Sequence, residues 1–208
     1  MHLATDGSQA NGIYRAIVRE NLARYSISSF SKDRRYFIRK GLEHCNIRPV
    51  ERLEDLLKDG YEVYANWARR TGWANGQESQ KFDAVISRCF QQSKCLAFGA
   101  YVGNTLAAFM LPCRMGNVVM LAFLASHSNL LKCFPNDALF HALLSIARQS
   151  PGVEMVFFGG MSITPSQNKF KLHYGSIKQF PSYTWINPVM RPIFDKWVRP
   201  RYPSLTSV

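Results

Sequence analysis

Apolar residues recur along this chain with two periods, one typical of amphipathic helices and one typical of buried strands. The clearest order lies in the last third of the sequence, where four segments follow one another. They are a helix from Asn136 to about Arg148, a strand from Val153 to Gly160, a short helix ending near Gly175, and an alternating strand from Ser176 to Trp185. Helices and strands that alternate in this way predict a mixed α/β layer.

Upstream of that layer, three stretches show helical spacing and one short stretch predicts a strand. The helices are Ser31 to Cys45 with Ser31 as N-cap, Arg52 to Thr71 with an interruption near Gly60, and Ser79 to Gln92. Asn46 to Val50 predicts a strand, and Pro49 favours an edge position for it.

A three-stranded antiparallel meander is predicted in the middle of the chain. Its strands are Lys94 to Tyr101, Thr105 to Cys113 ended by Pro112, and Val118 to Ser126. Gly103-Asn104 is a hairpin signal between the first two strands. Because these strands barely alternate, we expect the centre of the meander to be buried on both faces. The following loop, Ser126 to Pro135, is long enough to be functional.

The secondary structure of the first residues is less clearly indicated by the sequence. Tyr14 to Arg19 suits a helix or an alternating strand equally well, and the sequence leaves both interpretations open. We predict that residues 1–30 form an N-terminal, helical extension and that residues 31–208 form a single domain. The length suits one well-buried core.

Charge and cysteine content narrow the function classes. Lys and Arg number 26 against 14 Asp and Glu, and the net charge of +12 predicts either a polyanion partner or simply a basic protein. The five cysteines are scattered without the close pairs of a metal or redox site, so we expect reduced thiols, no bound metal and a cytoplasmic location. We expect neither a secretory signal nor a membrane-spanning helix.

The order of elements, taken with three short motifs, resembles a known superfamily. Arg34 to Gly41 is similar to the basic helix that opens the second half of Fem-type proteins, and Phe157-Phe158-Gly159-Gly160 fits the segment before their late motif. Phe170-Lys171-Leu172-His173-Tyr174-Gly175 is similar to that motif, Phe-Lys-x-x-Phe-Gly, with Tyr174 in the aromatic place. The chain thus resembles the GNAT superfamily of N-acyltransferases and, within it, the Fem-type aminoacyl transferases of peptidoglycan bridges.

This resemblance covers roughly Arg34 to Trp185 and shows two departures. Fem-type proteins usually carry two GNAT-like halves, whereas this chain has room for one, so we expect that a homodimer supplies the second. The chain also lacks the Gln/Arg-x-x-Gly-x-Gly loop that holds the pyrophosphate of CoA, and Ser126 to Lys132 stands in its place. The resemblance implies a mainly antiparallel sheet flanked by helices.

It also implies an activity, namely direct attack of an amine on an acyl or aminoacyl donor, either acyl-CoA or aminoacyl-tRNA. The acceptor would be a small-molecule or peptide amine, and donor and acceptor would meet near Ser126 to Asn136 and Ser166 to Tyr174. Such a protein orients both reactants, takes a proton from the amine and stabilises the oxyanion.

Several residues are candidates for these roles. Lys171 is the first choice for binding a phosphate or carboxylate, against the alternative of a surface lysine. The remaining binding candidates are Ser126, Ser128, Asn129, Asn136 and Tyr183. Asn136 suits phosphate binding at a helix N-terminus and simple N-capping equally well. The acid–base candidates are His127, His173 and Tyr174; packing or capping is the alternative for the last two.

A competing hypothesis comes from another class of protein. A catalytically silent GNAT-like module would use its positive surface to bind RNA or an anionic lipid. The basic segment from Lys32 to Lys40 admits three interpretations: a solvated helix face, a ridge that binds RNA or phosphate, and a membrane-surface helix.

Overall fold

The fold is known from a computed structural model, which describes residues 3–4, 12–74, 76, 78–91, 95–162, 164–183, 196 and 205–207. The chain divides into two compact units. The larger unit is Asn21–Val156, and the smaller unit combines Met1–Glu20 with Phe157–Val208. The predicted boundary between an extension, residues 1–30, and a single domain, residues 31–208, stays a prediction. The described residues 12–19, which that boundary assigned to the extension, supply a strand to the smaller unit.

The larger unit contains the predicted helices and the predicted meander. Its elements are η1 (Leu22–Arg24), η2 (Ile27–Ser29), α1 (Lys32–His44), β3 (Asn46–Pro49), α2 (Leu53–Thr71), α3 (Glu78–Phe90), β4 (Phe98–Val102), β5 (Thr105–Met115), β6 (Val118–Ser126), η3 (Ser128–Cys133), α4 (Pro135–Gln149) and the start of β7 (Met155–Gly160). Strands β3, β4, β5 and β6 pair in that order, and every pair is antiparallel. The fold class, a mixed α/β arrangement of mainly antiparallel strands flanked by helices, is confirmed.

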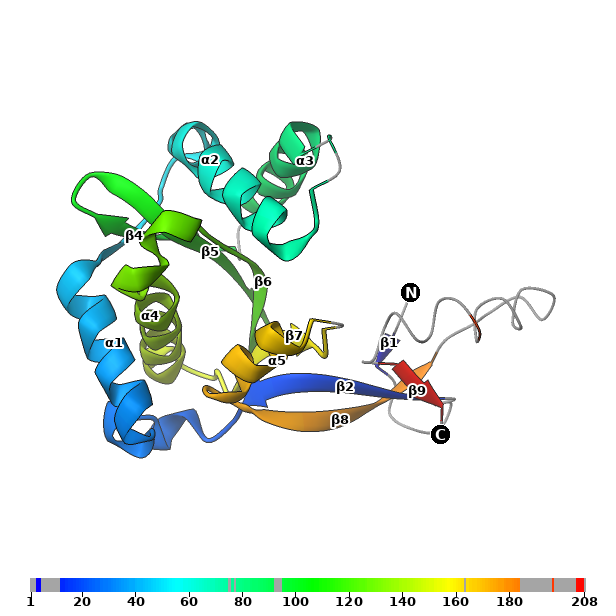
Figure 1. Ribbon diagram of the computed structural model, residues 1–208. Coiled ribbons are helices and arrows are strands. Elements are labelled where there is room, and N and C mark those ends of the chain that lie inside the picture. Colours follow the sequence, from blue (N-terminus) through cyan, green and yellow to red (C-terminus); the bar gives the residue numbers. More distant parts are fainter. Residues whose placement is uncertain are drawn as a thin grey trace. The chain divides into compact units, whose positions relative to one another are not determined.

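Helices cover both faces of this sheet (Figure 1). Phe109 and Leu111 of β5 belong to one apolar cluster with Val63 of α2 and Phe82 of α3. Because side chains alternate along a strand, Met110, between these two residues, points to the opposite face, where α4 packs on β4 and β5. Every residue of β5 from Leu106 to Cys113 is buried, so the prediction of burial on both faces is confirmed for this strand.

Two local predictions in the larger unit are wrong because tertiary packing overrides a helix or strand breaker. Helix α2 continues through Gly60, where an added Cβ would lie 2.9 Å from Leu56 Cδ1 and 3.2 Å from Phe82 Cζ. The glycine therefore allows close packing of α2 on α3. Strand β5 continues through Pro112, where its register with β6 shifts at a bulge, the position in a sheet that tolerates proline.

The prediction that all five cysteines are reduced is also wrong. Cys95 and Cys113 form a disulfide, with their Cα atoms 4.0 Å apart. The two residues face each other as an isolated antiparallel bridge beside β4 and β5, and this pairing brings together positions 18 residues apart in sequence. Spacing alone did not reveal it. Cys45, Cys89 and Cys133 are free thiols.

Helix α1 has the predicted N-cap, since the Ser31 hydroxyl accepts a hydrogen bond from the Arg34 backbone N–H at 3.4 Å. Its basic residues do not share one environment. The Arg34 guanidinium is buried and forms an ion pair with Asp137 of α4, whereas Lys40 pairs with Glu43 at the surface. The interpretation of the whole helix as a solvated basic face is therefore wrong for Arg34.

The smaller unit is built on β2 (Gly12–Arg19), which settles the open choice at Tyr14 to Arg19 in favour of a strand. β2 pairs antiparallel with β8 (Ser176–Tyr183), and β8 pairs with β1 (Leu3–Ala4). β9 (Leu205–Ser207) also pairs with β2, and α5 (Pro165–Leu172) packs on β2. Ala16, Ile17 and Val18 are all buried in succession, as in a strand covered on both faces. The helical character predicted for residues 1–30 is limited, among the described residues, to the 3-10 helices η1 and η2.

Candidate functional site

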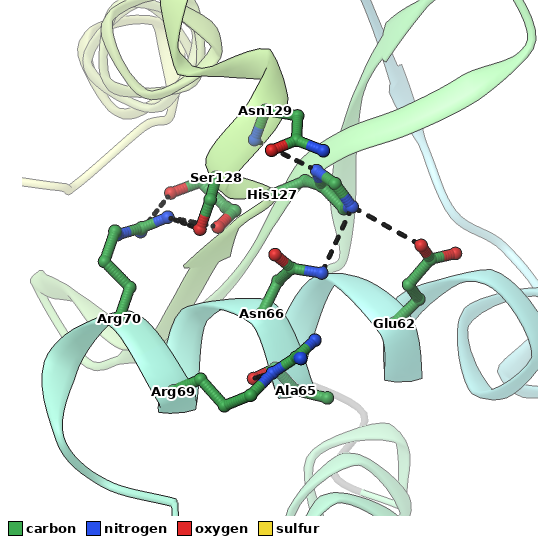
Figure 2. A network of polar contacts seen from close by, with 9 residues as sticks. Glu62, Ala65, Asn66, Arg69, Arg70, His127, Ser128 and Asn129 are labelled. Atoms are coloured by element: carbon green, nitrogen blue, oxygen red, sulfur yellow. Dashed lines mark hydrogen bonds and ion pairs between the residues drawn. The ribbon is translucent and has the colours of Figure 1, made fainter.

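A polar cluster in the larger unit forms where β6 ends. We call Arg70, Ser126, Ser128 and Asn136 the Arg70 cluster. Arg70, near the end of α2, donates from Nη1 to the Ser126 carbonyl and to Ser128 Oγ, and from Nη2 to Ser126 Oγ, each at 3.0 Å. Asn136 Nδ2 donates to the same Ser126 hydroxyl at 3.2 Å. Figure 2 shows the Arg70 side chain reaching from α2 toward Ser128 at the start of η3.

Arg70 carries a charge that its partners do not neutralise. All three of its hydrogen bonds go to neutral oxygens, and no ion pair involves it within the described part of the chain. Burial of the side chain lowers the pKa of Arg70, although a guanidinium stays protonated at any physiological pH. A positive charge held in place and lacking a counter-charge favours a bound anion.

The structure places Asn136 in this cluster instead of at a helix cap. Helix α4 is preceded by Phe134 in a left-handed conformation and starts at Pro135, so the N-cap interpretation of Asn136 is wrong. Its Nδ2 donates back to Ser126, while its Oδ1 is buried and has no hydrogen-bond partner among the described residues. Proline suits the first helical position because its missing N–H is not needed there.

His127 is held by contacts on both ring nitrogens. Its Nδ1 accepts a hydrogen bond from the Asn129 backbone N–H at 3.3 Å, so it caps η3. A neutral ring that accepts at Nδ1 carries its proton on Nε2. Nε2 lies 3.2 Å from Asn66 Nδ2 and 3.4 Å from Glu62 Oε1, and of these two atoms only the carboxylate oxygen can accept the Nε2–H (Figure 2). Because Nδ1 already accepts a hydrogen bond, His127 is better placed to order the loop than to take a proton.

Three residues of α2 that contact Ser126, His127 or Ser128 were not predicted from the sequence. Glu62, Asn66 and Arg70 lie four residues apart, and this spacing puts them on one helix face. That spacing was visible in the sequence. The partner of the face was not, because the contacts join positions 56 to 65 residues apart and local periodicity carries no information about such pairs.

The smaller unit holds the other predicted stretch, Ser166 to Tyr174. Lys171 lies on α5, and its Nζ would be 3.3 Å from a Cβ added to Gly159, so the ammonium packs over the backbone of β7. Burial lowers the pKa of Lys171. Lys171 is half-buried, and no acidic partner faces it among the described residues.

The three residues after α5 differ sharply in exposure. His173 is exposed, whereas Tyr174 is completely buried with its ring centroid 5.5 Å from that of Phe170. An added Cβ on Gly175 would lie only 2.3 Å from the Val18 carbonyl oxygen, so the motif needs glycine there to let β2 approach. Tyr174 and Gly175 therefore have clear packing functions.

The predicted site residues are divided between the two units. Asn129 contributes its backbone N–H to the His127 contact, and its side chain is exposed. Tyr183 is the last residue of β8, and Trp185 lies outside the described residues. Ser126, His127, Ser128, Asn129 and Asn136 belong to the larger unit, and Lys171, His173, Tyr174 and Tyr183 belong to the smaller.

Comparisons with known proteins identify the fold. No family model and no curated protein sequence matches the chain. The crystal structure of FemX aligns with 92% of this chain and 67% of its own, at 12% identity and a TM-score of 0.69. The C-terminal domain of a putative lysylphosphatidylglycerol synthetase from Agrobacterium fabrum aligns with 95% of this chain and 67% of its own, at 10% identity and a TM-score of 0.60.

A third solved structure is also similar to this chain. L-PGS from Bacillus licheniformis aligns with 90% of this chain and 65% of its own, at 14% identity and a TM-score of 0.55. These likenesses confirm a GNAT-like fold of the Fem type, as the motifs predicted. Where the structure describes the chain, no helix combines the length and apolar character needed to cross a membrane.

Proposed function

We propose, for a chain with a GNAT-like fold of the Fem type, that it transfers an acyl or aminoacyl group from an activated donor to an amine acceptor. The observation that carries this proposal is the likeness to FemX over 92% of the chain. The Arg70 cluster adds chemical support, because an uncompensated guanidinium at the loop that replaces the CoA pyrophosphate loop suits an anionic donor.

In the proposed reaction the amine nitrogen attacks the acyl carbonyl carbon, and the carbonyl oxygen becomes an oxyanion. Collapse of this intermediate expels the thiolate of CoA or the ribose oxygen of tRNA, and the proton lost by the amine ends on that leaving group. We assign donor binding to Arg70, Ser126, Ser128, Asn129 and Asn136. His127 orders the donor-binding loop through Asn129.

In the smaller unit, Lys171 binds a phosphate or carboxylate of a reactant, and its burial without an acidic partner among the described residues supports this role. The exposed His173 is the best candidate to accept the proton, because a histidine titrates near neutral pH. The complete burial of Tyr174 favours a packing role over proton transfer. Tyr183 stays a candidate for contact with the acceptor.

Aminoacyl-tRNA is the donor that the charge of the chain favours. A net charge of +12 attracts a polyanion, and the pyrophosphate loop typical of acetyl-CoA enzymes is absent from the sequence. The name of one structural neighbour refers to lysylphosphatidylglycerol, which carries an aminoacyl group. Acyl-CoA is the alternative donor.

Donor screening tests this proposal. The melting temperature of the full chain would be measured with acetyl-CoA, longer acyl-CoAs and aminoacyl-tRNA, because a ligand that binds the folded state stabilises it. We expect aminoacyl-tRNA to raise the melting temperature and uncharged tRNA to raise it less. Mass spectrometry would then detect the acylated amine, and Lys171→Ala and His173→Ala would each lower its yield.

One observation favours a second candidate function, a catalytically silent module that binds RNA or an anionic lipid. The same surplus of positive charge would serve such a module without any acyl chemistry. Stabilisation by uncharged tRNA or anionic vesicles, without a response to any acyl donor and without product, would favour this alternative over transfer.

A further inference from the structure

A cavity lies in the larger unit between the η1–η2 segment and the C-terminal half of α4. Its volume is about 270 Å³, and the polar residues of its lining are Tyr25, Ser26, His141, Ser145, Arg148 and Gln149. None of these residues belongs to the Arg70 cluster. The cavity is therefore a different site from the one proposed for the transfer reaction.

Hydrogen bonds within the cavity wall fix the orientation of two donor side chains, His141 and Arg148. The buried Tyr25 hydroxyl lies 2.6 Å from His141 Nδ1. A phenol O–H that donates to an imidazole nitrogen leaves the ring proton on Nε2, which makes Nε2 a donor. Arg148 Nη1 donates to the Tyr25 carbonyl at 2.9 Å, and this contact orients the guanidinium while leaving other N–H groups for a ligand.

The charge of the lining has one sign. Arg148 is the charged residue of the lining, and no carboxylate is among the described residues that form it. Burial lowers the pKa of His141, so the ring is neutral at physiological pH and contributes a dipole and an N–H instead of a charge. The Ser145 hydroxyl adds a donor that can adjust its direction, whereas the Ser26 hydroxyl caps η2 and contacts Ser28 Oγ at 2.9 Å. A guanidinium with several neutral donors matches the geometry of an oxyanion.

We propose that this cavity binds a small oxyanion, a phosphate or carboxylate group, through the Arg148 guanidinium, the His141 Nε2–H and the Ser145 hydroxyl. The volume accommodates such a group together with a few more atoms of a small metabolite. This site would regulate or position a small molecule independently of the acyl donor.

Titration calorimetry of the full chain tests the proposal with inorganic phosphate and acetate, against chloride at equal ionic strength. We expect saturable binding of phosphate or acetate with a dissociation constant below about 10 mM, as a charge-assisted contact allows. The preferred anion distinguishes a phosphate site from a carboxylate site. Absence of saturable binding of both anions would overturn the proposal.

Three variants locate the binding. Arg148→Gln should weaken it about tenfold or more through loss of a charge-assisted hydrogen bond. Ser145→Asp should abolish it by placing a carboxylate in the cavity, and Ser145 makes no side-chain hydrogen bond among the described residues that this change would break. Arg88→Gln removes an equal charge from the exposed end of α3 and should bind as the parent does. Unchanged binding in both cavity variants would contradict the assignment.

Discussion

Two arginines of the larger unit, Arg34 on α1 and Arg70 on α2, show how differently this fold treats a positive charge. The Arg34 side chain is 10% exposed and forms an ion pair with Asp137, whose side chain is 8% exposed. Arg70 is only partly buried, and its partners are a carbonyl and two hydroxyls. Arg34 joins α1 to α4, whereas Arg70 joins α2 to the loop after β6.

The difference separates a structural charge from one available to a ligand. The field of Arg34 is neutralised by a carboxylate within the protein, so the pair can stabilise packing without attracting an outside anion. The field of Arg70 is not neutralised by any described acidic group, so an anion that reaches the loop gains a full electrostatic contact. His141 differs from both arginines, since burial lowers its pKa and so favours the neutral ring.

The largest effect should follow from breaking the buried pair. Asp137→Ala leaves the Arg34 guanidinium buried without a counter-charge, and we expect a loss of about 3–5 kcal/mol in the free energy of unfolding. Urea denaturation followed by circular dichroism measures it. The control is Glu43→Ala, which breaks the exposed Lys40 pair and should give no measurable loss. Equal losses in both variants would remove the distinction between buried and exposed pairs.

Replacing both members of the pair should restore much of that loss. Arg34→Met with Asp137→Leu exchanges two buried charges for apolar side chains, so neither charge is left unpaired. We expect the double variant to lie within about 1–2 kcal/mol of the parent in free energy of unfolding. The same urea titration measures it. A double variant as unstable as Asp137→Ala would indicate that packing, and not the unpaired charge, dominates at this position.

Removing Arg70 should disturb stability less than removing Asp137. Arg70→Met loses one exposed and two partly buried hydrogen bonds to neutral oxygens. Because no charge is left unpaired, we expect a loss of about 1 kcal/mol. Denaturation with the same protocol checks this value. A loss as large as that of Asp137→Ala would assign Arg70 to the structural class and would weaken the donor-site proposal.

The smallest effect concerns the group that the fold keeps neutral. Burial lowers the pKa of His141 below its ordinary value, so the unfolded chain takes up a proton at a higher pH than the folded chain does. The resulting destabilisation is absent above about pH 6.5 and grows as the pH falls toward the folded pKa. We expect His141→Gln to lose less stability than the parent between about pH 7 and pH 5. Parallel stability profiles would contradict this prediction.

Much of the fold was predictable because its signals are local. The capped helix α1, the strand β6 and the helix α4 follow hydrophobic periods that the sequence displays directly. Gly60 and Pro112 were misjudged because their environment depends on α3 and on the β5 bulge, which no local pattern contains. The Cys95–Cys113 disulfide likewise depends on strand register.

The candidate site was predictable in part for the same reason. Ser126, Ser128 and Asn136 lie close together in sequence, and the loop they belong to was recognisable. Arg70 comes from a helix more than 50 residues earlier, and only the tertiary fold brings it to Ser126. The sequence also could not distinguish the buried Arg34 from the other arginines of α1, because the acidic partner of Arg34 is 103 residues away.

Donor binding to two neighbouring arginine variants tests the central claim most directly. Arg69 and Arg70 are adjacent on α2, but the one hydrogen bond of the Arg69 side chain within the described part of the chain goes to the Ala65 carbonyl of its own helix (Figure 2). Aminoacyl-tRNA and acyl-CoA would be titrated into the parent, Arg69→Met and Arg70→Met. We predict that one donor binds the parent, that Arg70→Met weakens it about tenfold, and that Arg69→Met changes it much less. Equal affinities for the two variants, or no donor binding at all, would contradict the account.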